Sequence, residues 1–192
     1  MNKGSLYPVI KRILDIFFSL WLIILLLLPM GVIAAAIALT SSGGVLFCQE
    51  RIGVGGKSFV CLKFRTMYTF APRSCPKSRL EAAERYITPV GRFLRRTSLD
   101  ELPQLFNVLM GDMSLVGPRP LVEEEGEIHA LRRRCGVYEL RPGITGLAQI
   151  SGRDDVSDIE KVRLDARYAR GLSLRTDVDI IIGTFFRSAK GR

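Results

Sequence analysis

Apolar residues are concentrated in one long run near the N-terminus, and elsewhere they recur at the short intervals of helices and strands. The run extends from Ile16 to Leu39 without a charged residue. As a straight α-helix, these 24 residues would be about 36 Å long, which is enough to cross the hydrocarbon core of a bilayer. A cleaved signal peptide is a poorer match, because its apolar region usually covers only about 7–15 residues. The pattern therefore predicts a membrane helix.

A proline near the middle of this run predicts that the helix is broken there. Pro29 removes one backbone hydrogen bond, and Gly31 follows it closely. Basic residues stand on both sides of the run: Lys3, Lys11 and Arg12 precede it, and Arg51, Lys57, Lys63 and Arg65 follow it. Because a spanning helix usually has one basic side, this symmetry favours a re-entrant helix–break–helix that enters and leaves the membrane by the cytosolic face. A kinked spanning helix is the alternative.

Two strands follow the apolar run. Val45–Arg51 and Ser58–Met67 flank the glycine-rich segment Gly53–Lys57, and this arrangement predicts a short β-hairpin. Within the second strand, Lys63 and Arg65 are two residues apart and therefore point to the same face. That face is either an ordinary solvated surface or a cationic surface that binds phosphate, and spacing alone favours neither interpretation.

The stretch from Thr97 to Pro120 combines acidic residues with helical periodicity. The acidic pair Asp100–Glu101 stands at the predicted start of an amphipathic helix, whose apolar face consists of Leu99, Leu102, Leu105, Phe106 and Leu109. Free N–H groups and the helix dipole favour both carboxylates and phosphates in a first turn, so a nucleophilic carboxylate and its phosphate substrate could meet there. The more common explanation of Ser98–Glu101 is a capping box.

Three further arginines lie in or near rigid segments. Arg119 stands between Pro118 and Pro120, and Arg141 precedes Pro142 and Gly143. Arg95 belongs to a helix that we expect to begin at the Thr88–Pro89 cap and to end at Arg96. Arg95 and its neighbours Arg92 and Arg96 lie just before the acidic pair, and arginines there could simply contact lipid headgroups, at about 1 kcal/mol each.

The remaining pattern predicts a single functional unit behind a membrane anchor. Besides the segments above, we expect a loop at 71–77 and helices at 78–86, 122–134 and 158–170, and a last helix capped by Thr176. The last helix has one apolar face, formed by Val178, Ile181, Ile182, Phe185 and Phe186, which either packs in the core or lies at the membrane interface. With no repeat or low-complexity linker, the expected organisation is an anchor at 1–44 and a cytosolic unit at 45–192.

Charge and composition restrict the partners. The 192 residues carry a formal net charge of +9, which favours an anionic partner such as nucleic acid, a lipid surface or a phosphorylated substrate. The four cysteines form no CxxC pair and the only histidine is His129, so a zinc site or histidine catalysis is not expected. Nucleic-acid binding is also disfavoured, because the aromatic residues belong mainly to apolar faces and not to basic stacking surfaces.

The order of motifs closely resembles one family. The sequence contains, in order, QERIG…KFRTM, RRTSLDELPQLFNVLMGDMSLVGPRP, RPGITGLAQISGRD and LDARYA…SLRTDVDI. Together they resemble the bacterial sugar transferases, which are monotopic phosphoglycosyl transferases, over nearly the whole chain. The resemblance implies a membrane-associated, helix-dominated α+β fold. It would have an N-terminal re-entrant anchor and a cytosolic catalytic domain of amphipathic and interfacial helices with a short β-hairpin.

The resemblance also implies a reaction and roles for individual residues. The reaction would move a sugar-1-phosphate from a UDP-sugar to undecaprenyl phosphate, at the cytosolic face of the bacterial inner membrane, and would release UMP. Asp100 would be the nucleophile and a ligand of Mg²⁺, supported by Glu101. Binding of the substrate phosphates would fall to the cationic residues Lys63, Arg65, Arg95, Arg119 and Arg141.

Other functions stay open at this point. A non-catalytic membrane scaffold or an anchored nucleic-acid-binding protein would share the anchor and the positive charge. The sequence decides neither the sugar nor the pathway, which could be that of a capsule, O-antigen, exopolysaccharide or glycoprotein. It also leaves open whether the protein forms a homodimer.

Overall fold

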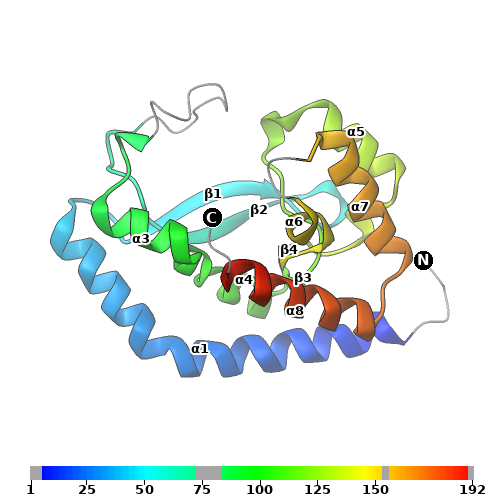
Figure 1. The fold of residues 1–192 in the computed structure, drawn as a ribbon, viewed down its shortest axis with the longest axis horizontal. Coiled ribbons are helices and arrows are strands. Elements are labelled where there is room, and N and C mark those ends of the chain that lie inside the picture. The colour runs from blue at the N-terminus through cyan, green and yellow to red at the C-terminus, as the bar shows by residue number, and fades with distance from the viewer. Residues whose placement is uncertain (1–5, 72–83, 153–155, 190–192) are drawn as a thin grey trace.

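The computed structural model describes residues 6–71, 84–152 and 156–189, and within them it shows a helix-dominated α+β fold (Figure 1). The helices are α1 (Tyr7–Thr40), α3 (Pro89–Thr97), α4 (Gln104–Met110), α5 (Glu127–Arg134), α6 (Leu147–Ser151), α7 (Asp158–Arg170) and α8 (Leu174–Ala189). The strands are β1 (Leu46–Ile52), β2 (Ser58–Phe64), β3 (Ser114–Val116) and β4 (Gly143–Thr145). Most of the loop and helix predicted at 71–86 lies outside the described residues.

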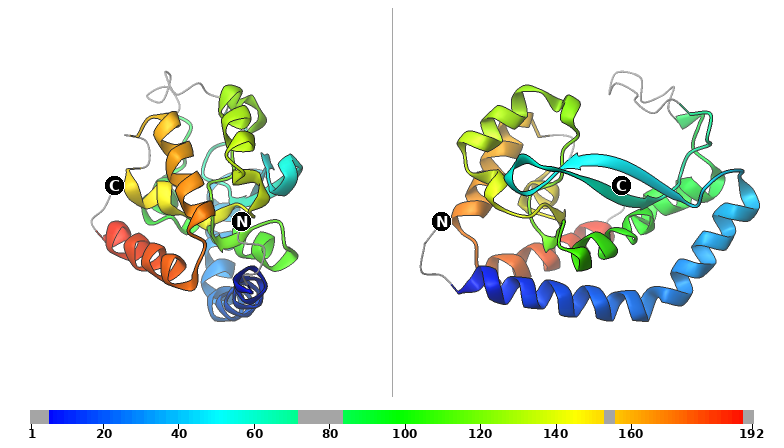
Figure 2. Two further views of the ribbon diagram at one scale, coloured as in Figure 1. Left: turned by 90° about the vertical axis from the view of Figure 1, so that its right-hand side faces the viewer. Right: turned by 180° about the vertical axis from the view of Figure 1, so that it is seen from behind.

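The long apolar run lies within one continuous helix, α1, of 34 residues. Pro29 lies inside this helix, and Figures 1 and 2 show that the helix bends without being interrupted. The predicted interruption of the helix at Pro29 is therefore wrong, because α1 is kinked but continuous. A proline removes a single hydrogen bond, and the bonds on either side of it hold the two arms together as one kinked helix.

One stripe of α1 packs on the rest of the protein, and the opposite face is apolar and exposed. The buried stripe consists of Asp15, Ser19, Ile23, Met30 and Ile37. The exposed large side chains include Ile13, Phe17, Leu20, Trp21, Ile24, Leu25, Leu28, Val32 and Leu39. Among the described helices, α1 alone has the length and hydropathy needed to cross a membrane.

The basic residues at the start of α1 bind other parts of the fold. Lys11 forms an ion pair of 2.6 Å with Asp177 of α8. The guanidinium of Arg12 donates to the carbonyls of Val108 (2.7 Å) and Leu109 (3.1 Å), near the C-terminal end of α4. The N-terminal arm of α1 is therefore tied to the same folded unit that follows its C-terminal arm.

The predicted hairpin is confirmed. Strands β1 and β2 pair in antiparallel register, with Cys48 opposite Leu62, and a short 3₁₀ turn at Val54–Gly56 joins them. A second sheet pairs β3 with β4 in parallel, and each of these strands has only three residues. Three residues are too few to show the alternation of apolar and polar side chains that marks a strand, so the sequence pattern did not reveal β3 and β4.

The later helices match the pattern in part. The helix predicted at 158–170 is confirmed as α7. The helix expected at 122–134 is split, because Gly126 has φ = 53° between a 3₁₀ turn at Glu123–Glu125 and α5. The last helix begins earlier than predicted, and Ser173, rather than Thr176, supplies the capping oxygen that accepts the Thr176 N–H.

The apolar face of α8 lies on the outside. Its members Val178, Ile181, Ile182, Phe185 and Phe186 are all exposed, whereas Ile180 is buried against Val116 and Tyr168. Helix α4 lies between α1 and strand β2 of the hairpin, and α8 lies on the same side of the molecule as α1 (Figures 1 and 2). This face therefore does not pack in the core, and its position at a membrane interface stays a prediction.

Candidate active site

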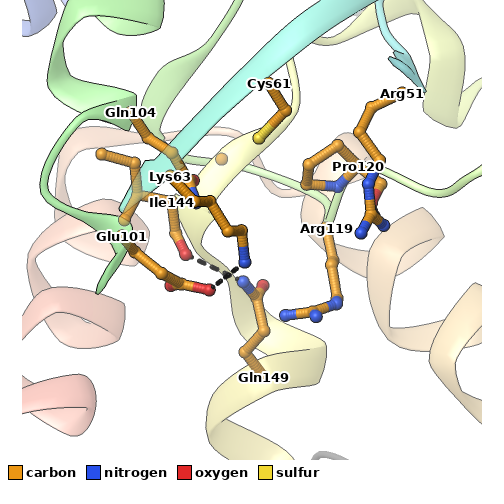
Figure 3. Close-up of a pocket in the computed structure, with 10 residues that line it drawn as sticks. Arg51, Cys61, Lys63, Glu101, Gln104, Arg119, Pro120, Ile144 and Gln149 are labelled. Carbon is orange, nitrogen blue, oxygen red and sulfur yellow. Dashed lines mark hydrogen bonds and ion pairs between the residues drawn. The ribbon is translucent and has the colours of Figure 1, made fainter. Parts of the chain in front are cut away.

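A polar cleft opens where the hairpin meets the segments on either side of β3 and β4 (Figure 3). Its walls come from β1, β2, the 3₁₀ turn at Leu99–Glu101, the Pro118–Pro120 loop, β4 and α6. The lining residues are Arg51, Cys61, Lys63, Glu101, Gln104, Arg119, Pro120, Gly143, Ile144 and Gln149. Three of the residues predicted for the site, Lys63, Glu101 and Arg119, therefore meet in one place.

The acidic pair lies in the first turn of a short 3₁₀ helix, Leu99–Glu101, so the predicted position at a helix start is confirmed only in part, because this turn is separate from α4. Ser98 has φ = 58° and ends α3, with its N–H bonded to the carbonyls of Leu94 and Arg95. Its side chain makes no capping hydrogen bond, so the expected capping box is absent. Asp100 and Glu101 lie instead on a separate 3₁₀ turn, and α4 begins only at Gln104.

The two members of the acidic pair have different surroundings. The Glu101 carboxylate forms an ion pair of 2.7 Å with the ammonium of Lys63, and each side chain is about one-fifth exposed. Burial raises the pKa of the Asp100 carboxyl above its ordinary value, and the neighbouring Glu101 raises that pKa further, whereas Lys63 and Arg95 lower it. Asp100 is thus a partly desolvated carboxylate whose charge depends on nearby cations.

Two guanidinium groups stand on the other side of the cleft. The side chain of Arg119 extends from the Pro118–Pro120 loop toward Gln149, and Arg51 lies beside it (Figure 3). Burial lowers the pKa of Arg51, and the positive charge of Arg119 lowers it further. Two cations held this close would bind an anion more readily than either one alone.

The other predicted cationic residues bind the protein itself. Arg65 is buried and donates to the carbonyls of Ser41 (2.9 Å) and Ser42, just beyond α1. Arg141 donates through Nε to the Gly111 carbonyl (2.9 Å), just beyond α4. Neither residue lines the cleft. Their substrate-binding role stays a prediction.

Arg95 occupies an intermediate position. Its Nε donates to the hydroxyl of Thr66 at 2.9 Å. It does not line the cleft, but its charge lowers the pKa of Asp100. This places it on the Asp100 side of the site, and contact with a substrate also stays a prediction.

Sequence reasoning missed several lining residues. Arg51 and Gln149 belong to the QERIG and QISGRD motifs, but nothing in their spacing marked them as part of the site. The side-chain amide of Gln149 donates to the Ile144 carbonyl at 3.0 Å, which holds its head group in the cleft (Figure 3). The cleft also contains Cys61, whose pKa is raised by burial.

Comparisons with known proteins agree with this geometry. The profile of the family described as "Bacterial sugar transferase" matches residues 6–191. The chain is 41% identical over 193 residues to a "UDP-galactose-lipid carrier transferase" of Erwinia amylovora, covering 91% of this chain and 39% of that protein.

Two further relatives are similar to the same degree. An "Undecaprenyl-phosphate glucose phosphotransferase" of Komagataeibacter xylinus is 40% identical over 194 residues, covering 95% of this chain and 36% of that protein. An "Exopolysaccharide production protein ExoY" of Rhizobium meliloti is 39% identical over 203 residues, covering 95% of this chain and 88% of that protein. The chain therefore spans well under half of the first two relatives but most of the third.

Proposed function

This chain belongs to the bacterial sugar transferase family, and on that premise we propose that it transfers a sugar-1-phosphate from a UDP-sugar to undecaprenyl phosphate. The observation that carries the proposal is the cleft in which Glu101, the neighbour of Asp100 in the chain, meets three cations, Lys63, Arg51 and Arg119. Asp100 does not itself line the cleft, but the charge of Lys63 lowers its pKa. Relatives named for undecaprenyl phosphate and for UDP-sugars support this choice of substrates. Their names include both glucose and galactose, so the proposal does not specify the sugar.

The proposed chemistry uses Asp100 as a covalent nucleophile. Its carboxylate oxygen attacks the β-phosphorus of the UDP-sugar, the bond from that phosphorus to the bridging oxygen breaks, and UMP leaves. The resulting acyl phosphate carries the sugar-1-phosphate. An oxygen of undecaprenyl phosphate then attacks the same phosphorus and breaks the bond to Asp100, which regenerates the carboxylate. Two steps of this kind replace one difficult displacement.

The cations of the cleft address the main obstacle, which is repulsion between a carboxylate and a diphosphate. Lys63 pairs with Glu101 at 2.7 Å and also favours the charged form of Asp100. Arg119 and Arg51 lie on the opposite wall, and in this proposal they receive phosphate oxygens. Preorganised charges of this kind stabilise the developing negative charge without reorganisation during the reaction.

The residues present fit a magnesium ion that is shared with the substrate. Within the described residues there is no group of three His, Cys, Asp or Glu side chains that could hold a metal. Mg²⁺ commonly needs only one or two carboxylates plus substrate phosphates, so Asp100, with Glu101 beside it, is sufficient on the protein side. When bound, the ion would neutralise phosphate charge at the reacting centre.

We also propose a re-entrant anchor at the cytosolic face of the inner membrane, and contacts at both ends of α1 support the re-entrant arrangement. Lys11 in the first arm of α1 binds Asp177, and the chain beyond the second arm binds Arg65 through Ser41 and Ser42. Because both ends of α1 contact the same folded unit, we propose that both ends lie on one side of the membrane. Together, the exposed apolar faces of α1 and α8 would then lie in the bilayer and its interface.

A labelling experiment tests this topology. In a background without the native cysteines, Leu6→Cys and Ser42→Cys should both react with a membrane-impermeant thiol reagent from the cytosolic side only. Reaction of the two positions from opposite sides would show a spanning helix instead.

The function is tested by UMP release from a panel of UDP-sugars, with undecaprenyl phosphate and Mg²⁺, for the wild type and Asp100→Asn. We expect release by the wild type, and a loss of at least about 10³-fold in the variant, because an amide cannot form the acyl phosphate. The melting temperatures of the two proteins should agree. Asp179→Asn, an exposed carboxylate on α8, serves as the matched control. Equal release by Asp100→Asn would exclude Asp100 as the nucleophile, and inactivity of the wild type with every donor would favour a scaffold.

A further inference from the structure

The Pro118–Pro120 loop is held at every carbonyl. The carbonyl of residue 118 accepts from the backbone N–H of Gly143 at 2.9 Å. The carbonyl of residue 119 accepts from a guanidinium N–H of Arg132 at 2.7 Å, and that of residue 120 accepts from Arg51 at 3.1 Å. Because proline also fixes φ at two of the three residues, little backbone freedom is left in the loop. The Arg119 side chain, by contrast, is exposed and extends into the cleft.

Arg132 is itself held by a buried carboxylate. Its other terminal nitrogen forms an ion pair with Asp165 of α7, and the two side chains are only 4% and 1% exposed. Asp165 belongs to the LDARYA motif, which has no part in the proposed chemistry. The sequence pattern predicted only a helix at residues 122–134 and gave no indication of this contact. The pair connects α5 and α7 to the loop that carries Arg119.

Stability alone is a poor explanation for this arrangement. A buried ion pair often contributes less than apolar residues of the same size, because both charges lose their hydration. Burial raises the pKa of Asp165 to about 6 even with Arg132 beside it, which reflects that cost. The Nε of Arg132 is buried and has no hydrogen-bond partner within the described part of the chain. The pair does fix the orientation of the Arg132 side chain, because its planar guanidinium connects the Asp165 carboxylate to the carbonyl of residue 119.

We infer that Arg132, oriented by Asp165, is a positioning residue that sets the location of the Arg119 guanidinium in the cleft. It acts through the backbone of the loop, from behind the cleft, and touches no substrate. The inference rests on the proposed function, in which Arg119 receives a phosphate of the donor. A displacement of about 1 Å at a substrate-positioning group can reduce catalysis by as much as about 10²-fold, so a residue outside the cleft can affect turnover.

A double-mutant cycle tests the inference on the full chain in detergent or lipid discs. Donor KM and kcat are measured for the wild type, Arg119→Ala, Arg132→Met and the double variant. Arg132→Met should lower kcat/KM about tenfold, mainly through a higher donor KM. In the Arg119→Ala background the same change should cost less than about twofold, because the group that it positions is already absent. An equal loss in both backgrounds would overturn the inference and leave Arg132 a purely structural residue.

Three additions keep the test decisive. Arg134→Met removes an exposed charge from the same helix and should leave donor KM unchanged. If Arg132→Met does not fold, Asp165→Asn replaces it in the cycle, because it removes the charge that orients Arg132 while keeping the side-chain shape. Hydrogen exchange supplies a readout that does not depend on turnover: loosening of the loop predicts faster exchange in the peptide covering residues 115–122 and unchanged exchange in α8. If the wild type shows no turnover, the proposed function fails, and exchange alone decides whether Arg132 holds the loop.

Discussion

Cationic side chains that look alike in the sequence belong to two different regions of the molecule. In the cleft, the charged groups of Lys63 and Arg119 face space that a substrate can enter. At the helix ends, the guanidinium groups of Arg65 and Arg141 bind backbone carbonyls just beyond α1 and α4. All four were predicted to bind substrate. The groups that surround these side chains in the fold distinguish the two kinds. Their charge and the rigidity of their segments do not.

The difference has a simple physical cause. The last carbonyls of a helix lack intrahelical partners and carry the negative end of its dipole, so they attract cations as a phosphate does. The end of α4 illustrates this, because Arg12 binds the carbonyls of Val108 and Leu109 and Arg141 binds that of Gly111. A basic residue near a helix end is therefore ambiguous evidence for a phosphate site.

The strongest test of this division compares the two arginines that stand in proline-containing loops. Arg119→Ala should reduce kcat/KM for the donor by about 10²-fold, the usual effect of removing one preorganised charge from a transition state. Arg141→Ala removes the same side chain from an exposed site and should change kcat/KM by no more than about twofold. Steady-state UMP release at saturating acceptor measures both. Comparable losses in the two variants would place Arg141 in the cleft group.

A smaller effect is expected for the charge that supports Asp100. Asp100 must be ionised to attack, and its pKa is raised mainly by burial and by Glu101. As the pH is lowered, kcat/KM should therefore begin to fall at a higher pH than it would for an exposed aspartate. Lys63 lowers that pKa. Lys63→Met should therefore move the acidic limb of the profile to higher pH, and should reduce activity at neutral pH by about tenfold.

The control for this pH profile is Lys57→Met, which removes an exposed charge from the same hairpin. Its acidic limb should coincide with that of the wild type. A Lys63→Met profile that also coincides with the wild type would mean that Lys63 does not control the ionisation of Asp100.

Local signals in the sequence were sufficient for much of the fold. The hairpin, α3 and α7 were predicted because each depends on nearby residues: a glycine-rich turn between strands, the Thr88 cap whose hydroxyl accepts the Gly91 N–H, and a periodic helix between Ser157 and Gly171. The long apolar helix was equally clear. These features are determined within a few residues of chain.

The features that the sequence did not reveal depend on distant contacts. Ser98 adopts a left-handed conformation as α3 ends, and this displaces the acidic pair from the start of α4 onto its own turn. Arg51 and Gln149 are 98 positions apart in the sequence and meet only when the hairpin lies across β4 and α6. Lys63 and Arg65 share a strand face by periodicity, yet only Lys63 lines the cleft.

The smallest expected effect on turnover tests the second region directly. Arg65 is buried and donates to the carbonyls that follow α1, including that of Ser41 at 2.9 Å, and to the Ser41 hydroxyl at 3.0 Å. Arg65→Met should lower stability by about 2 kcal/mol through these lost charge-assisted hydrogen bonds, and so reduce the melting temperature by about 4–8 °C. Donor KM and kcat, measured well below that temperature, should stay at wild-type values.

Arg96→Met, an exposed position on α3, controls for the lost charge. If donor KM rises while the melting temperature is unchanged, Arg65 binds substrate after all. In that case a movement during catalysis would have to bring Arg65 into the cleft, because Arg65 does not line the cleft in this structure.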